Sequence, residues 1–362
     1  CFVCSHGGNV FTFLQDYLKI SFMEAVKMVA QMGNVDLGDF TFYEEKPHVN
    51  QELEPYYLMH EEANRIYKHY LTTKLALEAN RYLSQRHLSK DIIDYFEIGY
   101  APEQNILLKA FEKSGFSRMQ AYESGLVIES EVGYDRYSNR IMFPLFNTNG
   151  DTIGFSGRIY NTKSDSKYIN TRETLIFKKG ENLYNYHLAK DEARKEKSLI
   201  VVEGFMDVIR LYSIGVKNVV ALMGTSLTKE QTTLIKRTST NIILMLDGDN
   251  PGKKAIVNVG QILEEENLRV NVVALPEELD PDEYILKYGK ENFINLLNNP
   301  IEYSEFKINY LKEGKDLTKI DEQSSYVNEV LQELSNIDDD IKKELILKKL
   351  EKEFNLDIEF LR

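Results

Sequence analysis

Short apolar runs and longer amphipathic segments alternate along this chain between residues 199 and 297. The apolar runs have the length of strands that are buried on both faces of a sheet, and they lie at 199–203, 217–222, 242–246 and 269–275. Segments with helical spacing follow them at 205–214, from Thr228, at 251–267 and from Pro281. This repeated β-α pattern predicts a parallel, doubly wound sheet with right-handed crossovers.

Two of these helices have recognisable N-terminal signals. Thr228 and Gln231 have the spacing of a capping box. Asn250 is placed to cap the next helix, with Pro251 in its first turn.

The rest of the chain has other patterns. Helical spacing occurs at 10–32, 56–77, 80–88 and 91–96, and beyond 298 the chain is acidic and wholly helical in pattern. Residues 140–146 and 152–160 alternate around Asn149-Gly150, which predicts a β-hairpin. The polar stretch 44–54 is the best candidate for a linker.

We therefore expect an α/β fold (α+β overall), with a Rossmann-like sheet between a basic α+β part and a helical bundle. The expected boundaries are 1–45, 52–190, 191–297 and 298–362.

Length and composition limit the class of protein. The chain has 362 residues, is 43% hydrophobic, and contains no apolar run of membrane-spanning length. It has only two cysteines, which fits a reducing cytoplasm better than a disulfide scaffold. Because it begins at Cys1 without an initiator methionine or a leader, we interpret it as a fragment of a longer protein that acts as a monomer.

The net charge of −13 hides a basic segment. Residues 136–190 contain nine basic and four acidic side chains; the basic ones are Arg136, Arg140, Arg158, Lys163, Lys167, Arg172, Lys178, Lys179 and Lys190. A basic segment beside an acidic one is typical of a groove that binds a polyanion. A solvated surface would look similar.

Acidic residues follow three of the predicted strands. They are Glu203, then Asp247 with Asp249, then Asp280 with Asp282, and Asp207 lies at a helix start close to Glu203. Ligands of open α/β folds bind at the carboxyl ends of the strands, and paired carboxylates are what a magnesium-type cation needs. The chemistry that suits such a site is metal-dependent phosphoryl or nucleotidyl transfer.

Each acid also has a structural interpretation. Asp280-Pro-Asp-Glu283 is an ordinary helix start, and Asp207 fits as a partner of a helix dipole. Glu203 and Asp247 gain nothing structurally at the end of a buried strand. Converging carboxylates would repel one another unless cations lay between them.

Cys1-Phe-Val-Cys4 has the spacing of half a structural zinc site. In this fragment alone we interpret Cys1 and Cys4 as free thiols. In the full-length protein we expect them to bind Zn²⁺ together with ligands that precede them.

Several motifs resemble one known family. Residues 201–208, 246–252 and 280–283 resemble the TOPRIM module that topoisomerases and primases share. The motifs at 134–137, 139–144, 153–158, 167–170 and 221–226 resemble the catalytic core of bacterial DnaG-type primases in order and spacing, and residues 1–8 resemble the end of that family's zinc-ribbon domain. The chain departs from the family at His87, where glycine is usual.

The resemblance implies a DNA-directed RNA polymerase that makes short primers on single-stranded DNA in the bacterial replisome. It implies that Glu203, Asp247 and Asp249 are catalytic and, with Asp207, Asp280 and Asp282, hold Mg²⁺ or Mn²⁺. It also implies that the template or the NTP is bound by Arg136, Arg140, Arg158, Lys167, Asn170 and Lys179. The chain looks as if it stops before the family's helicase-binding domain.

We also hypothesise that polyphosphorylated guanosine nucleotides compete for the same site. Two alternatives stay open. One is a TOPRIM nuclease or topoisomerase that cuts DNA with the same acids. The other is a non-catalytic nucleic-acid-binding protein in which the acids only cap helices.

Overall fold

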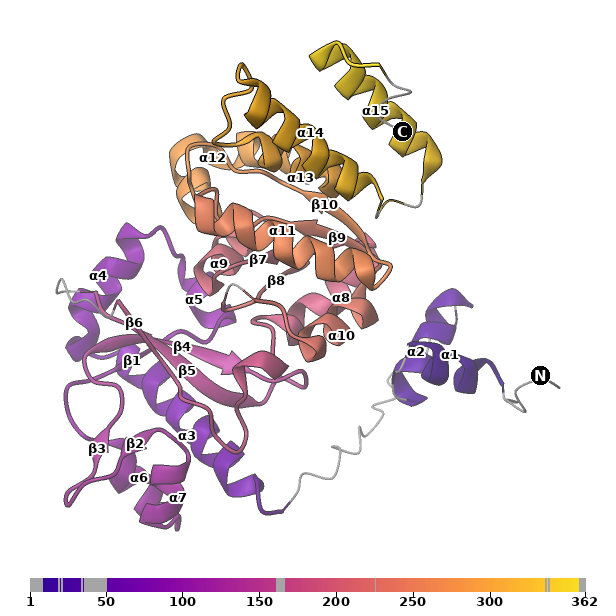
Figure 1. The fold of residues 1–362 in the computed structure, drawn as a ribbon. Coiled ribbons are helices and arrows are strands. Elements are labelled where there is room, and N and C mark those ends of the chain that lie inside the picture. Colours follow the sequence, from indigo (N-terminus) through magenta and orange to yellow (C-terminus); the bar gives the residue numbers. More distant parts are fainter. Residues whose placement is uncertain are drawn as a thin grey trace.

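The computed structural model describes residues 9–18, 20, 22–33, 35, 51–160, 167–224, 226–335, 337 and 339–357. At the N-terminal end, α1 (Val10–Leu18) and α2 (Phe22–Met32) pack against each other (Figure 1). The sequence predicted a single helical stretch here, whereas the structure has two helices. Most of the predicted linker, residues 44–50, lies outside the described residues.

The next part of the chain is built on a four-stranded antiparallel sheet of order β1-β4-β5-β6. Its strands are β1 (Gly99–Ala101), β4 (Arg140–Phe146), β5 (Thr152–Arg158) and β6 (Tyr168–Asn170). The hairpin β4-β5 confirms the prediction, and its turn is closed by the Asn147 side chain, which accepts from the backbone N–H groups of Asn149 and Asp151. The long helix α3 (Glu54–Leu71) packs on β1 and β5.

Smaller elements surround this sheet. The helices are η1 (Lys74–Ala76), α4 (Leu77–Gln85), α5 (Lys90–Tyr95), α6 (Leu107–Lys113), α7 (Arg118–Glu123) and η2 (Lys179–Glu181). A separate two-stranded ladder pairs β2 (Val127–Ile128) with β3 (Tyr134–Asp135). We refer to residues 54–181 as the basic subdomain.

A five-stranded sheet of order β11-β10-β9-β7-β8 forms the second part. Its parallel strands are β7 (Leu199–Val202), β8 (Val219–Ala221), β9 (Asn241–Leu244) and β10 (Arg269–Val272), as the apolar runs predicted. The antiparallel edge strand β11 (Ile301–Glu302) was not predicted, because two residues carry no periodic signal. We call residues 186–302 the acidic subdomain.

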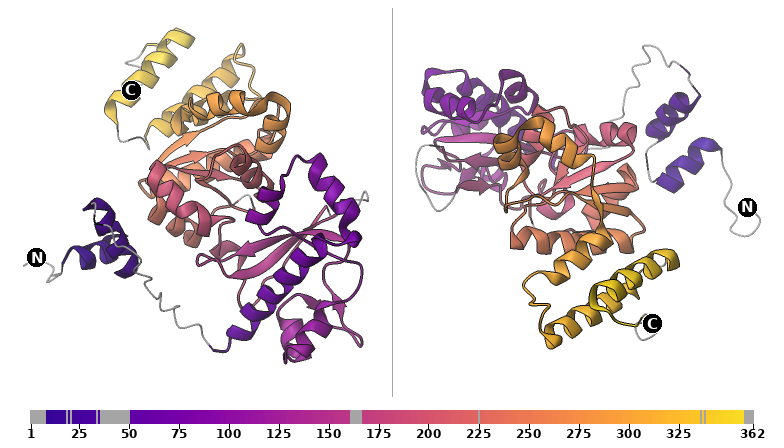
Figure 2. Two further views of the ribbon diagram at one scale, coloured as in Figure 1. Left: turned by 180° about the vertical axis from the view of Figure 1, so that it is seen from behind. Right: turned by 90° about the horizontal axis from the view of Figure 1, so that it is seen from above.

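Helices cover both faces of this sheet (Figures 1 and 2). One face packs against α9 (Phe205–Ser213) and α12 (Pro281–Leu297). The other packs against α8 (Tyr186–Glu196), α10 (Lys229–Thr238), α11 (Asn250–Glu265) and α13 (Tyr303–Lys312). Along β7, Ile200 and Val202 belong to the first core, and Leu199 and Val201 to the second.

The C-terminal helices α14 (Ile320–Leu334) and α15 (Asp340–Phe354) have a core of their own, to which Tyr326, Val330 and Leu350 contribute. This region is helical as predicted. No helix in the described ranges is both long and apolar enough to cross a lipid bilayer.

The basic and acidic subdomains share one hydrophobic core. Ile141 and Phe143 of β4 belong to the same buried cluster as Val208 of α9. Phe205, the first residue of α9, contacts the rings of Phe143 and Tyr168 from the basic subdomain. The shared core fixes the position of the basic subdomain over the carboxyl end of β7.

Candidate active site

A cleft of about 380 Å³ lies where the two subdomains meet. Charged side chains of both signs line it, and these are Arg86, Arg158, Lys167, Lys179, Glu203, Asp207, Asp247, Asp280 and Asp282. The acids belong to the acidic subdomain and the bases to the basic subdomain. The cleft therefore brings the predicted acidic edge together with part of the predicted basic segment.

Sheet topology places the two central acids. The chain passes from β7 to β8 on one side and then returns to β9 on the other side of β7. The crevice between β7 and β9 is consequently a topological switch point, where open α/β sheets bind their ligands. Glu203 follows β7 directly and Asp247 follows β9 after two buried residues. Both carboxylates thus lie at the mouth of this crevice.

Three further acids lie at helix starts. Asp249 caps α11 by accepting from the N–H of Gly252 at 2.8 Å, so the cap is Asp249 and not Asn250 as predicted. Asp280 caps α12 by accepting from the N–H of Glu283 at 2.6 Å. Each of these caps uses one oxygen of the carboxylate for the backbone.

Asp207 differs because the backbone uses both of its oxygens. Its Oδ2 accepts from the N–H of Gly204 at 3.1 Å, and its Oδ1 accepts from the N–H of Asp282 at 3.4 Å. The residue is 5% exposed. Asp207 therefore ties the start of α9 to the start of α12.

Burial, and then the charges of neighbouring acids, raise the pKa values of the carboxyl groups. Burial, followed by the charges of Glu203 and Asp280, raises the pKa of Asp247 from 3.8 to about 7. Burial also raises the pKa of Glu203, with Asp249 as the second cause, and the pKa of Asp280. The pKa of Asp207 is raised well above its usual value, first by burial and then by Asp280 and Asp247.

The site suits a divalent cation that is shared with a ligand. The Oδ1 atom of Asp247 is buried and accepts no hydrogen bond within the described part of the chain, so it is a free oxygen ligand. Among the same residues no three His, Cys, Asp or Glu side chains are arranged to hold a metal ion by themselves. Magnesium is commonly held by one or two carboxylates, waters and substrate phosphates, and this arrangement matches that pattern.

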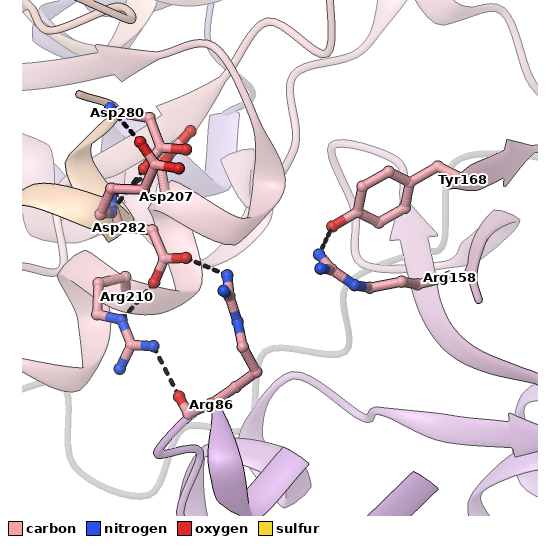
Figure 3. Close-up of polar contacts among 8 residues, drawn as sticks. Arg86, Arg158, Tyr168, Asp207, Arg210, Asp280 and Asp282 are labelled. Atoms are coloured by element: carbon pink, nitrogen blue, oxygen red, sulfur yellow. Dashed lines mark hydrogen bonds and ion pairs between the residues drawn. The ribbon is translucent and has the colours of Figure 1, made fainter. Parts of the chain in front are cut away.

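Asp282 faces arginines (Figure 3). Its Oδ1 accepts from Arg210 Nε at 2.6 Å, and its Oδ2 pairs with Arg86 Nη2. Neither Arg86 nor Arg210 was predicted as a site residue. No pattern in the sequence marks them, because 196 residues separate Arg86 from its partner.

The residues that were predicted to bind the template or the NTP divide into two groups. Arg158, Lys167, Asn170 and Lys179 line the cleft. The guanidinium group of Arg158 lies over the ring of Tyr168 and donates to its hydroxyl (Figure 3).

Arg136 and Arg140 do not line the cleft, because both bind the backbone of the sheet. Arg136 donates to the carbonyl of Asn170 at 3.2 Å, and Arg140 donates to that of Gly157 at 3.0 Å. Burial lowers the pKa of Arg140. Cys1, Cys4 and Lys163 lie outside the described residues.

Comparison with known protein families gives matches along most of the chain. Residues 1–44 match the CHC2 zinc finger, 66–190 match the N-terminal domain of the DNA primase catalytic core, and 200–285 match a Toprim-like model. These matches indicate divalent-metal binding in the Toprim-like part, and zinc binding as a general property of the domain type that residues 1–44 match.

Residues 304–359 match the DnaB-helicase binding domain of primase. This match corrects the expectation that the chain stops before a helicase-binding domain. The segment is acidic and helical without a distinctive motif, so the sequence pattern alone indicated only a helical bundle.

Similar proteins have been described from several bacteria. The DNA primase of Enterococcus faecalis is 38% identical over 373 residues, which cover 99% of this chain and 59% of that protein. That of Staphylococcus epidermidis is 42% identical over 305 residues, which cover 82% of this chain and 50% of that protein. The matched parts of the chain thus span between half and three fifths of the length of these relatives.

Solved structures agree with the sequence matches. The zinc-binding and RNA polymerase domains of Aquifex aeolicus primase align with a TM-score of 0.72 and 29% identity over 100% of this chain and 85% of that one. A DnaG primase catalytic domain bound to ssDNA aligns with a TM-score of 0.70 and 30% identity over 84% of this chain and 98% of that one. Since the matched models follow one another in the order of a single family and the identity extends along the chain, this protein belongs to the DnaG-type family of bacterial DNA primases.

Proposed function

We propose that this chain is the polymerising part of a primase, which copies single-stranded DNA into short RNA primers from NTPs. The observation that carries the proposal is the cleft in which free carboxylate oxygens of one subdomain face the cations of the other. Membership of the primase family supports it. The chain spans only part of the length of its relatives, so primer synthesis by the whole protein is also proposed here.

The reaction is a nucleotidyl transfer. The 3′-hydroxyl oxygen of the primer attacks the α-phosphorus of an NTP, the new P–O bond forms, pyrophosphate leaves with the electrons of the broken bond, and the hydroxyl proton passes to solvent. Magnesium or manganese, when bound, lowers the pKa of this hydroxyl and stabilises the leaving pyrophosphate. Glu203, Asp247, Asp249 and Asp280 would hold the metal, because each keeps at least one carboxylate oxygen that accepts no backbone hydrogen bond in the described residues.

The cations hold the polyanions. Lys167 and Lys179 are exposed at the edge of the cleft, and Arg158 lies within it. Their charges would neutralise the triphosphate and the template backbone while Asn170 offers a neutral amide. Arg136 and Arg140 would act one layer behind, by keeping β5 and β6 in place.

Partners follow from the same family. We propose that the chain binds single-stranded DNA, NTPs and the RNA primer/DNA hybrid in the cytoplasm, and that residues 304–359 take part in contact with the replicative helicase. Cys1 and Cys4 would bind Zn²⁺ in the full-length protein. Polyphosphorylated guanosine nucleotides would compete with NTPs at the metal-triphosphate site, and a titration that shows no competition would contradict this.

One gel tests the proposal. The protein is incubated at high concentration with single-stranded DNA, labelled NTPs and Mg²⁺ or Mn²⁺, beside an Asp247→Asn variant. Short labelled RNA that requires both template and metal, and is lost in the variant, is the expected result. Cut DNA with intact NTPs would instead show the TOPRIM nuclease alternative. Metal-independent DNA binding that the variant retains, without any product, would show the non-catalytic one.

A further inference from the structure

Asp282 is the most fully paired acid of the cleft. Its side chain is 3% exposed, and that of Arg210, which donates to it from Nε, is 5% exposed. Arg86 pairs with the other oxygen and is 27% exposed. Arg210 also donates from Nη2 to the backbone carbonyl of Arg86 at 2.7 Å, which closes a ring of three interactions (Figure 3). We call these three residues the arginine clasp.

The clasp joins elements that are distant in sequence. Arg86 is the C-cap residue of α4 in the basic subdomain. Arg210 lies on α9 and Asp282 in the first turn of α12, both in the acidic subdomain. Because two of the three interactions reach Arg86, the clasp holds the end of α4 against the helices that carry the acids.

We infer that Asp282 is a positioning residue and not a metal ligand, an inference that rests on the proposed primase function. Both of its oxygens already accept from guanidinium groups, and a divalent cation at Asp282 would have to lie beside two positive charges. Asp280 lies two residues earlier on the same helix start, and among the described residues only a backbone N–H group donates to it. The helix start of α12 therefore has two separate tasks: Asp280 faces the metal, and Asp282 holds the subdomains together.

The clasp also sets the position of the Arg86 guanidinium group in the cleft. Arg86 lines the cleft, as does Arg158 (Figure 3). Since Asp282 and Arg210 fix both the guanidinium and the backbone of Arg86, the spacing between the acidic and basic walls depends on this contact. Reacting groups that are misplaced by about 1 Å lose about a hundredfold in rate, so a loosened clasp should slow synthesis without removing any metal ligand.

Mn²⁺ binding separates the two roles. Four proteins are titrated with Mn²⁺ and followed by the paramagnetic signal of free Mn²⁺: wild type, Asp247→Asn, Asp282→Asn and Arg86→Gln. Asp247→Asn should lose at least about tenfold in affinity, because a direct ligand is gone. Asp282→Asn and Arg86→Gln should stay within about threefold of wild type, because they remove no ligand. An affinity of Asp282→Asn as low as that of Asp247→Asn would overturn the inference.

Primer synthesis and hydrogen exchange test the positioning role. Arg86→Gln should lower kcat at least about tenfold with little change in KM for NTP, and should speed amide exchange in α4 and α5 but not in the parallel sheet. Arg86→Lys keeps the positive charge, so it should recover part of kcat and part of the protection of α4 and α5 against exchange. Normal kcat and unchanged exchange in Arg86→Gln would refute a positioning role.

If Asp282→Asn does not fold, Arg86→Gln still tests the inference, because it leaves the buried Asp282–Arg210 pair intact. If wild type makes no primer, the proposed function fails. The Mn²⁺ and exchange results would then still judge the clasp on their own.

Discussion

Asp247→Asn should make the metal-free protein more stable. Each pKa unit corresponds to 1.36 kcal/mol, so the rise of the Asp247 pKa from 3.8 to about 7 corresponds to about 4 kcal/mol when the carboxylate is fully ionised. Asp247 is only half-buried, and solvent screening reduces the expected gain to about 2 kcal/mol. Asparagine has nearly the same shape and removes the charge that burial, Glu203 and Asp280 oppose.

The sign of the pH dependence follows from a raised carboxyl pKa. Well below pH 3.8 the group is protonated in both the folded and the unfolded protein and has no effect on stability. As the pH rises toward about 7, the unfolded protein releases this proton first, and wild type loses stability relative to the variant. The stabilisation by Asp247→Asn should therefore be small at acid pH and reach its full value above the folded pKa.

Thermal unfolding in EDTA and in Mg²⁺ checks both statements. In EDTA above neutral pH the variant should melt about 4–8 °C higher than wild type. Mg²⁺ should raise the melting temperature of wild type and leave the variant almost unchanged, because a metal stabilises only the state that binds it. Glu103→Gln also replaces a carboxylate by an amide, but at an exposed position, and is the control. It should change neither the melting temperature in EDTA nor the rise that Mg²⁺ causes. A variant that melts no higher in EDTA, or that gains as much from Mg²⁺ as wild type, would refute the reasoning.

Four further substitutions test other parts of the structure. His87 follows α4 with a φ of +55°, so His87→Gly should stabilise the protein by about 0.5–1 kcal/mol in urea unfolding, and a loss of stability would contradict this. Gly260 lies against the ring of Tyr303, so Gly260→Ala should cost about 1–3 kcal/mol in the same assay, and an unchanged midpoint would show that the helices move apart freely. Lys167→Ala and Lys179→Ala should weaken binding of single-stranded DNA, and each should make the negative slope of log K against log salt shallower by about 0.7, whereas an unchanged slope would place the template elsewhere.

The sequence predicted the parts of the fold that depend on local pattern. The strands before Glu203 and Asp247 are apolar runs, and the meeting of their carboxyl ends follows from parallel pairing alone. The capping box of Thr228 and Gln231 was also predicted and is present. Local pattern failed where the outcome depends on a single residue, as in the cap of α11, which is Asp249 and not its neighbour.

The sequence did not predict contacts between side chains that lie far apart along the chain. Asp282 shares a helix start with Asp280, and nothing in the four residues from Asp280 to Glu283 distinguishes an oxygen that is free from one that meets arginines. The difference arises only when α4 packs against α9 and α12. The sequence analysis named both Asp280 and Asp282 as metal ligands, and only the structure shows that their surroundings differ.

Electrostatic cost explains why the acids divide in this way. Several carboxylates in one half-buried cleft repel one another, and a folded protein has to neutralise some of them without metal. Asp282 is neutralised by two arginines, and Asp207 accepts two backbone N–H groups. Asp247 receives no such partner in the described residues and has its pKa raised to about 7. A bound cation would remove the repulsion that remains at Asp247, so we propose that the metal binds beside this carboxylate.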